Sequence, residues 1–204
     1  MPGYFEPVAD SGGTGGSAAV RLDDGEISVL RSLTVQLLEL IGPDQGESEN
    51  ADPLNALFTE GPSEPPSDPA LARLFPDAYG DPEEPPDSAA RTRSAEFRRY
   101  TESDLRTQKR DRLLAMVRDL DEARSRRRGS AGEAVLTLDE AGSGNWLGGL
   151  NDLRLVIGAR LGIEDESTTE KLFDLPDDDP RKAMVIAFLW LGSLQETLVE
   201  TLLP

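Results

Sequence analysis

The 204-residue chain contains no cysteine and no histidine, and only three of its 21 basic residues are lysines. Thiol nucleophiles, disulfides, thiolate zinc sites and imidazole ligands or bases are therefore excluded. A serine or threonine nucleophile would need another base, and Lys109, Lys171 and Lys182 are isolated from one another in sequence. We therefore expect a protein that is not an enzyme and that has no catalytic, cofactor-binding or metal-binding residues.

Long hydrophobic runs are also missing. The longest, AMVIAFLWL at 183–191, is much shorter than the roughly 18 residues that a membrane span needs. Its all-round apolar character is typical of a central core helix. The first 22 residues contain neither the basic nor the apolar region of a secretory signal. We expect a cytoplasmic protein with no membrane segment and no membrane partner.

Positive charge is scarce overall but concentrated in one segment. The formal net charge is −18, yet residues 91–128 hold thirteen Lys and Arg residues against seven Asp and Glu residues. Residues 43–90, directly before them, hold twelve carboxylates against one arginine. This asymmetry within one chain is the most informative physical feature of the sequence.

Helical periodicity dominates the rest of the chain. Capping signals and apolar residues at helical spacing predict long helices at about 24–41, 91–128, 140–161 and 180–202, and short ones at 51–58, 68–75 and 167–173. AVLTLD at 134–139 is the one short extended segment, too short to found a sheet by itself. The predicted fold class is all-α, an irregular bundle of about four long helices plus short helices.

The predicted domain organisation is simple. Residues 1–22 are rich in Gly, Ser and Ala without periodicity and are expected to form a disordered tail. Residues 23–203 are expected to form a single helical domain with a disordered, acidic, proline-rich insert at 43–67. The glycines at 148–149, inside a predicted helix, are expected to permit close approach of a second helix.

The triple aspartate at 177–179 has the residue type of a cation site. Consecutive carboxylates do not reproduce the alternating ligands of a calcium loop. They instead complement the positive end of the helix that follows, with Asp179 as its cap. We expect no metal there.

Basic side chains are the candidate site residues: Arg98, Arg99, Arg106, Lys109, Arg110, Arg154 and Arg160. Those of the 91–128 helix could form internal pairs such as Arg98 with Glu102, or bind an acidic protein face or the chain's own 43–90 segment. Nucleic acid is disfavoured as a direct ligand because the chain is acidic and offers few interleaved aromatic residues. Arg154 and Arg160 lie among apolar residues, so each needs a carboxylate from this chain, a ligand or a partner.

Four segments, taken in order, resemble the actinobacterial family named for the oxidative-stress regulator AosR and earlier catalogued as a domain of unknown function. They are RLFPDAYGD at 73–81, EFRRYTESDLR at 96–106 with the following Lys109, WLGGLNDLRLVIGARLGI at 146–163 and LGSLQETLV at 191–199. The resemblance implies a non-enzymatic cytosolic regulator that acts by protein–protein interaction, with a sigma factor or RNA polymerase component as the expected partner in a stress response.

The resemblance also leaves alternatives open. The family's usual gene neighbours suggest an adaptor or accessory factor linked to ClpS-type proteolysis or to cysteine biosynthesis, and a homo-oligomer is compatible with either role. In the regulator that names the family, function is linked to a thiol switch. This chain has no cysteine, so direct thiol sensing is excluded here.

Overall fold

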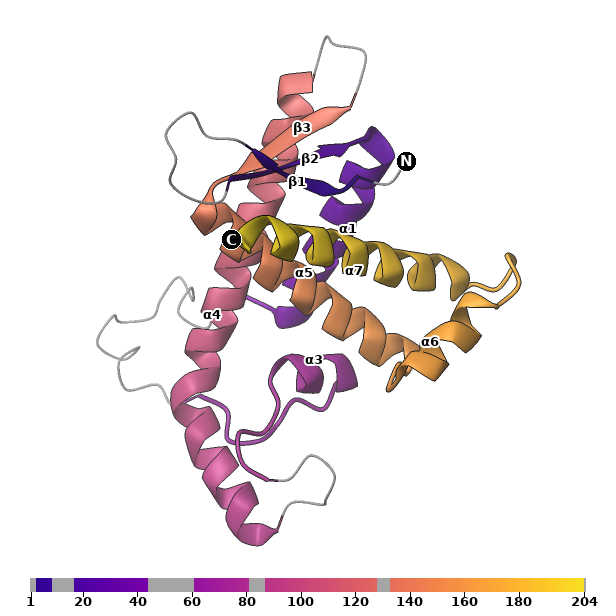
Figure 1. The fold of residues 1–204 in the computed structure, drawn as a ribbon. Helices are drawn as coiled ribbons and strands as arrows, with labels where there is room; N and C mark the ends of the chain where they lie inside the picture. The colour runs from indigo at the N-terminus through magenta and orange to yellow at the C-terminus, as the bar shows by residue number, and fades with distance from the viewer. Residues whose placement is uncertain (1–2, 9–16, 44–60, 81–86, 128–132, 204) are drawn as a thin grey trace.

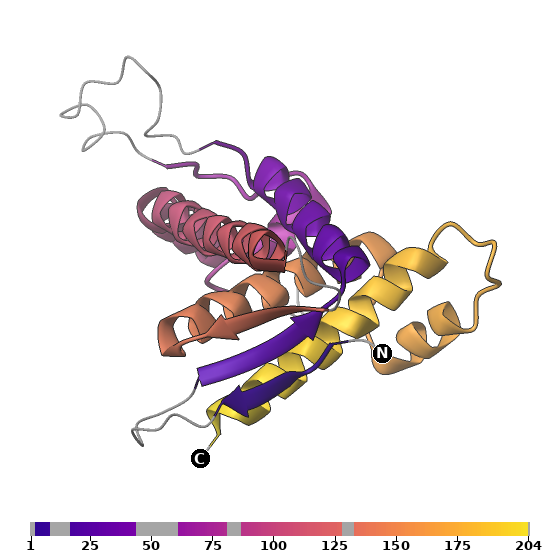
Figure 2. The same cartoon turned by 90° about the horizontal axis from the view of Figure 1, so that it is seen from above.

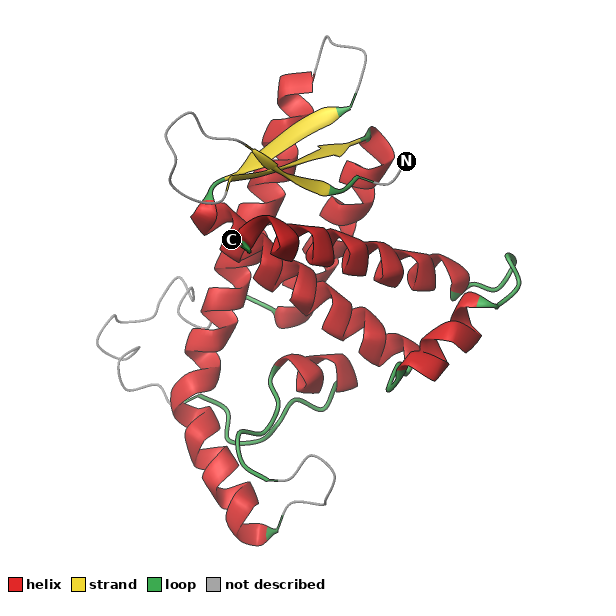
Figure 3. Ribbon diagram, viewed as in Figure 1, coloured by secondary structure: helices red, strands yellow, loops and turns green. Residues whose placement is uncertain are grey.

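The computed structural model describes all residues except 1–2, 9–16, 44–60, 81–86, 128–132 and 204 (Figure 1). Its elements are β1 (Phe5–Val8), β2 (Ser17–Leu22), α1 (Asp24–Ile41), α3 (Pro69–Leu74), α4 (Ser88–Arg127), β3 (Ala134–Leu138), α5 (Glu140–Leu161), α6 (Glu166–Phe173) and α7 (Lys182–Leu202). Helices make up most of the described chain, and a small sheet lies at one end (Figure 3). The fold is therefore mostly helical but not all-α.

The sheet corrects an expectation from the sequence. Its three antiparallel strands have the order β1-β2-β3, with Val20 opposite both Phe5 and Leu136. Alternate residues of β2 and β3 point into the core, as a half-buried sheet requires. Residues 3–8 and 17–22, expected to belong to a disordered tail, are thus part of the fold. The extended segment at 134–139, too short to found a sheet by itself, contributes the edge strand β3 to this one.

Most helix starts follow the capping signals. Asp23 and Glu26 form both hydrogen bonds of a capping box at the start of α1, at 2.8 and 2.9 Å. Asp68 caps α3 directly before Pro69, and Asp139 caps α5. The last two helices are exceptions: Asp165 caps α6, and α7 begins at Lys182 without a side-chain cap, although Asp179 was the expected one. The expected helix at 51–58, and most of the insert at 43–67, lie outside the described residues.

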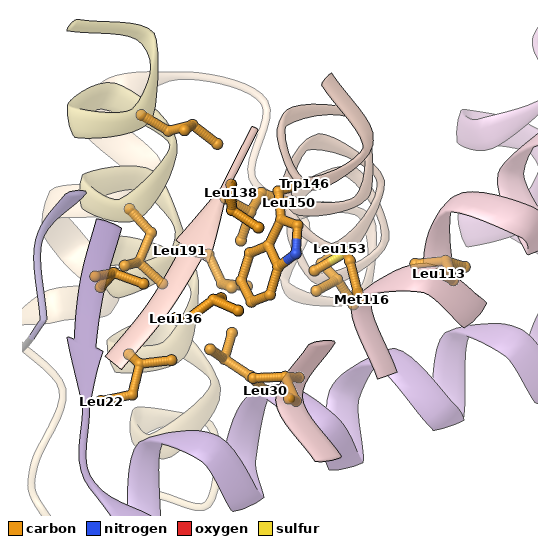
Figure 4. Close-up of a cluster of buried hydrophobic side chains, with 14 of the residues drawn as sticks. Leu22, Leu30, Leu113, Met116, Leu136, Leu138, Trp146, Leu150, Leu153 and Leu191 are labelled. Carbon is orange, nitrogen blue, oxygen red and sulfur yellow. The ribbon is translucent and has the colours of Figure 1, made fainter. Parts of the chain in front are cut away.

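The core lies where the sheet meets the long helices. β1 contacts α7 while β3 contacts α4, so the sheet bridges two helices that are distant in sequence (Figure 2). Trp146 of α5 is fully buried at the centre, with Leu136, Leu150 and Leu191 around it (Figure 4). Its indole Nε1 donates a 2.8 Å hydrogen bond to Asp119 of α4. A buried tryptophan thus keeps its polar atom satisfied.

Gly149 sets how closely α5 approaches α4. A Cβ atom added at this position would lie 2.1 Å from Sδ of the fully buried Met116. The Gly149→Ala variant is expected to lose about 1–3 kcal/mol of unfolding free energy, since overpacking outweighs the gain in helix propensity of about 1 kcal/mol. Urea denaturation measures the difference.

Gly144→Ala in the same helix is the matched control. No heavy atom lies within 4 Å of its added Cβ, so this variant is expected to keep or raise stability by up to about 1 kcal/mol. Equal stability of the two variants would contradict the close packing of α4 and α5.

α7 lies closer to the surface than its composition indicates. Four of its residues are buried, Val185, Leu191, Leu194 and Leu198, while Ile186 is 52 % exposed. Within the described part of the chain, α7 is the one helix long and apolar enough to cross a bilayer by length and composition, with a mean hydropathy of 1.3 over its best window. Here α7 packs on α5, β1 and α6. The expected central core helix is therefore a helix with one face left open.

Candidate functional site

The basic residues of α4 that stand out in the sequence face the protein interior. Arg98 is 4 % exposed and Glu102 is 2 % exposed, and their side chains pair one helical turn apart. Nη2 of Arg98 also donates to Asp77 at 2.9 Å and to the carbonyl oxygen of Phe75 at 3.0 Å. Arg98 therefore fastens the segment that follows α3 onto α4.

Arg106 and Arg110 continue this row towards α1. Nε and Nη2 of Arg106 donate to Oε1 of Glu102 at 3.0 and 2.8 Å, and Nη1 donates to the carbonyl oxygen of Ile41 at 2.7 Å. Arg110 donates to the carbonyl oxygen of Gly42. Carbonyls at a helix C-terminus lack partners within the helix and carry its negative dipole end. Two arginines of α4 thus stabilise the end of α1.

We call Arg98, Glu102 and Arg106 the buried charge cluster, and Asp77, whose side chain is 36 % exposed, pairs with Arg98 at its edge. Both guanidinium groups share the one carboxylate of Glu102, and Arg106 also lies 4.6 Å from the centre of the Phe75 ring. In a buried cluster of this kind each charge depends on its partner for compensation. The cluster therefore explains why Arg98 and Arg106 stand in this segment, whereas Arg91, Arg93 and Arg118 of the same helix are exposed.

The remaining predicted residues differ in their surroundings. Lys109 donates to Asp152 at 2.6 Å and joins α4 to α5, and Arg160 pairs with Asp68 at 2.7 Å and joins α5 to α3. Arg99 is half-buried on α4. Arg98, Arg106, Lys109 and Arg160 thus pair with carboxylates, and Arg110 donates to a backbone carbonyl oxygen. Arg154 of α5 instead donates to the neutral side chain of Gln195.

Several of these contacts move pKa values. Burial opposes the charge of Arg98, but its hydrogen bonds to Asp77 and Glu102 outweigh this effect, and the pKa of Arg98 is raised. The hydrogen bond from Arg160 lowers the pKa of Asp68. These charged forms are favoured by the fold.

In the triple aspartate, Asp179 forms an ion pair with Arg181 and does not cap α7. Asp179 accepts from the backbone and side chain of Arg181, which lowers the pKa of Asp179 from 3.8 to about 2. The lowered pKa stabilises the fold above pH 3.8, and this contribution is lost as the pH falls towards 2. α7 begins three residues after Asp179, at Lys182. Among the described residues no group of three or more acidic side chains is arranged to hold a metal ion.

An open apolar groove lies between the start of α1, the end of α6 and the first half of α7; we call it the α1–α7 groove. Its volume is about 710 Å³. Ile186 and Phe173 are each 52 % exposed and Val29 is 44 % exposed. Asp23 and Glu26 also line the groove, whereas lysine and arginine are absent from its described lining. Contiguous exposed apolar surface of this kind marks interaction sites in soluble proteins.

Sequence reasoning missed this groove. The signal was present in AMVIAFLWL, because a helix that is apolar all round carries more apolar surface than one packing neighbour can cover. The sequence does not show which side of α7 the sheet and α5 cover. The structure shows that they leave the Ile186 side open.

Comparison with known proteins places the chain in a family. The family described as "Domain of unknown function (DUF2017)" matches residues 7–202, and the chain belongs to this family. It is 31 % identical over 188 residues to a Mycobacterium leprae relative that carries the AosR name, covering 87 % of this chain and 79 % of the relative.

Proteins named oxidative stress regulator AosR from Mycobacterium bovis and Mycobacterium tuberculosis are each 29 % identical to this chain. The match covers 87 % of this chain and 78 % of each relative. No solved structure matches the chain. The names of these relatives support a regulatory role.

Proposed function

We propose that this protein is a non-enzymatic cytosolic regulator that acts by binding another protein, a sigma factor or RNA polymerase component, in a stress response. The single observation that carries the interaction is the open α1–α7 groove. The relatives' names support the regulatory role, and the resemblance to their family motivates the choice of partner.

The groove has the features of a site for an amphipathic helix. Its exposed side chains come from two neighbouring helices and from α6, and an apolar groove between helices accepts the apolar face of a third helix. Ile186 and Phe173 are exposed enough to become buried on binding. The partner segment is therefore a helix with an apolar stripe.

The negative charge at one end of the groove indicates which kind of partner helix it binds. Asp23 and Glu26 give the groove an acidic end, and the whole chain carries a formal charge of −18. A second copy of the chain would bring the same negative charge and be repelled at low salt. A basic amphipathic helix of another protein meets both the apolar lining and the acidic end.

Ile186→Asp is expected to weaken binding to the purified partner about 10- to 100-fold, because a polar group buried without a partner costs about 1–3 kcal/mol. Isothermal titration calorimetry with purified sigma factors and RNA polymerase core enzyme measures the effect. Val199→Asp is the matched control. Val199 lies on the same helix, is 37 % exposed and is not part of the groove lining.

Unchanged binding of the Ile186→Asp variant, or equal loss in both variants, would reject the groove as the binding surface. The same titration with a ClpS-type adaptor separates the alternative role in proteolysis. Binding to that adaptor and to none of the transcription proteins would favour the alternative.

A further inference from the structure

A second cavity, which we call the Arg154 cavity, lies between α3, the second half of α5 and α7. Its volume is about 510 Å³, within the range of small-molecule sites of roughly 300–1,000 Å³. Arg73, Asn151, Arg154, Glu164 and Phe188 are among its lining residues. It shares no lining residue with the α1–α7 groove.

Arg154 is a half-buried cation that forms no ion pair with any residue that the structure describes. Its Nη1 donates to the neutral side chain of Gln195 at 2.6 Å, and its guanidinium lies 5.2 Å from the centre of the Phe188 ring. Its Nε is buried and has no hydrogen-bond acceptor in the described part of the chain. No carboxylate among the described residues pairs with it, in contrast to Arg98, Arg106 and Lys109.

A half-buried guanidinium that no described carboxylate pairs with loses part of its hydration, and an anion that enters the site offsets that loss. Arg73 adds a second cation at the cavity wall, and none of its described contacts is an ion pair. Glu164 contributes one negative charge, so the described charged lining carries a net charge of +1. One monoanionic group balances this charge.

We propose that the Arg154 cavity binds a small carboxylate with an apolar body. A planar carboxylate matches the planar donor fork of a guanidinium. Leu155, Ile163 and Phe188 supply apolar wall for the remainder of the ligand. This site adds ligand binding to the proposed protein–protein interaction and does not depend on it. Binding of such a carboxylate is a signal that this chain, which has no cysteine, can sense without a thiol.

The test uses the full chain and sodium hexanoate as the probe, at constant ionic strength set with sodium chloride. Two-dimensional ¹H–¹⁵N NMR follows the Nε–H of Arg154. A saturable shift is expected at about millimolar ligand, as suits a ligand of this size. Hexanamide, which has the same shape without charge, is expected to cause no saturable shift, and inorganic phosphate is expected to behave like chloride.

Variants identify the residues, with ligand-observed NMR as the readout. Arg154→Gln is expected to abolish saturable hexanoate binding, and Arg73→Gln to weaken it about tenfold, the effect of losing one charged hydrogen bond. Arg118→Gln on α4 is the control and is expected to bind like the original chain. If Arg154→Gln fails to fold, Arg73→Gln and the hexanamide comparison still decide the outcome.

Three results would overturn the proposal. They are equal binding of hexanoate and hexanamide, an equal shift with phosphate, or undiminished hexanoate binding by the Arg73→Gln or Arg154→Gln variant. Loss of partner binding by the Ile186→Asp variant bears only on the α1–α7 groove, so the two proposals fail separately.

Discussion

Glu102→Gln is expected to reduce the free energy of unfolding by about 3–5 kcal/mol, because it leaves two arginines in a largely buried site without their shared carboxylate. Glu102 is 2 % exposed, and it is the described carboxylate that contacts both Arg98 and Arg106. Asp77 compensates only Arg98. Small domains are stable by about 5–15 kcal/mol, so the variant is expected to be at or near the limit of folding.

Equilibrium unfolding in urea measures this loss, and Glu122→Gln is the matched control. Glu122 forms the same i,i+4 pair with Arg126 on the same helix, but its side chain is 64 % exposed. Exposed pairs contribute about 0–1 kcal/mol. Similar small losses in both variants would show that the cluster is solvated and would reopen the α4 arginines as a binding face.

Phe5→Ala is expected to cost about 3–5 kcal/mol, the usual range for removing a buried phenylalanine. Phe5 is 4 % exposed, its ring meets the edge of Trp146 at a centroid distance of 6.0 Å, and its backbone N–H donates to Thr197 of α7. The same residue in a disordered tail would contribute nothing. Thermal unfolding followed by circular dichroism measures the effect.

Tyr4→Ala tests the same segment without touching the core, because Tyr4 is 49 % exposed. Its expected effect is within about 0.5 kcal/mol, as for other surface substitutions. If the Phe5 and Tyr4 variants are equally stable, the N-terminal strands do not belong to the fold. Together the two variants test whether the N-terminal residues form part of the sheet or a disordered tail.

The helices could be predicted because their signals are local. The capping box of Asp23 and Glu26 and the Asp68–Pro69 pair lie within a few residues of the helix starts that they stabilise. The sheet could not be predicted, because Val20 pairs with Leu136, more than a hundred residues away. Small residues at Ser17–Ala19 also give β2 little intrinsic strand preference.

The candidate site could be predicted only in part, because a sequence indicates local contacts but not tertiary ones. The spacing of four residues made an Arg98–Glu102 pair one of the alternatives, but Asp77 and Asp152 become partners only through tertiary packing. The composition gave no sign that Arg154 would form no ion pair with a described carboxylate. The groove was hidden because hydrophobicity along α7 does not reveal which face is covered.

The proposed binding surface lies on α7, whereas the buried ion pairs lie on α4. The most direct test is amide hydrogen–deuterium exchange on the complex with the partner identified by calorimetry. We predict new protection at 23–29 and 183–193, which include the α1 and α7 sides of the groove, and no change at 98–110. Protection confined to 98–110, with exchange at 183–193 unchanged, would show that the partner binds α4 and not the α1–α7 groove.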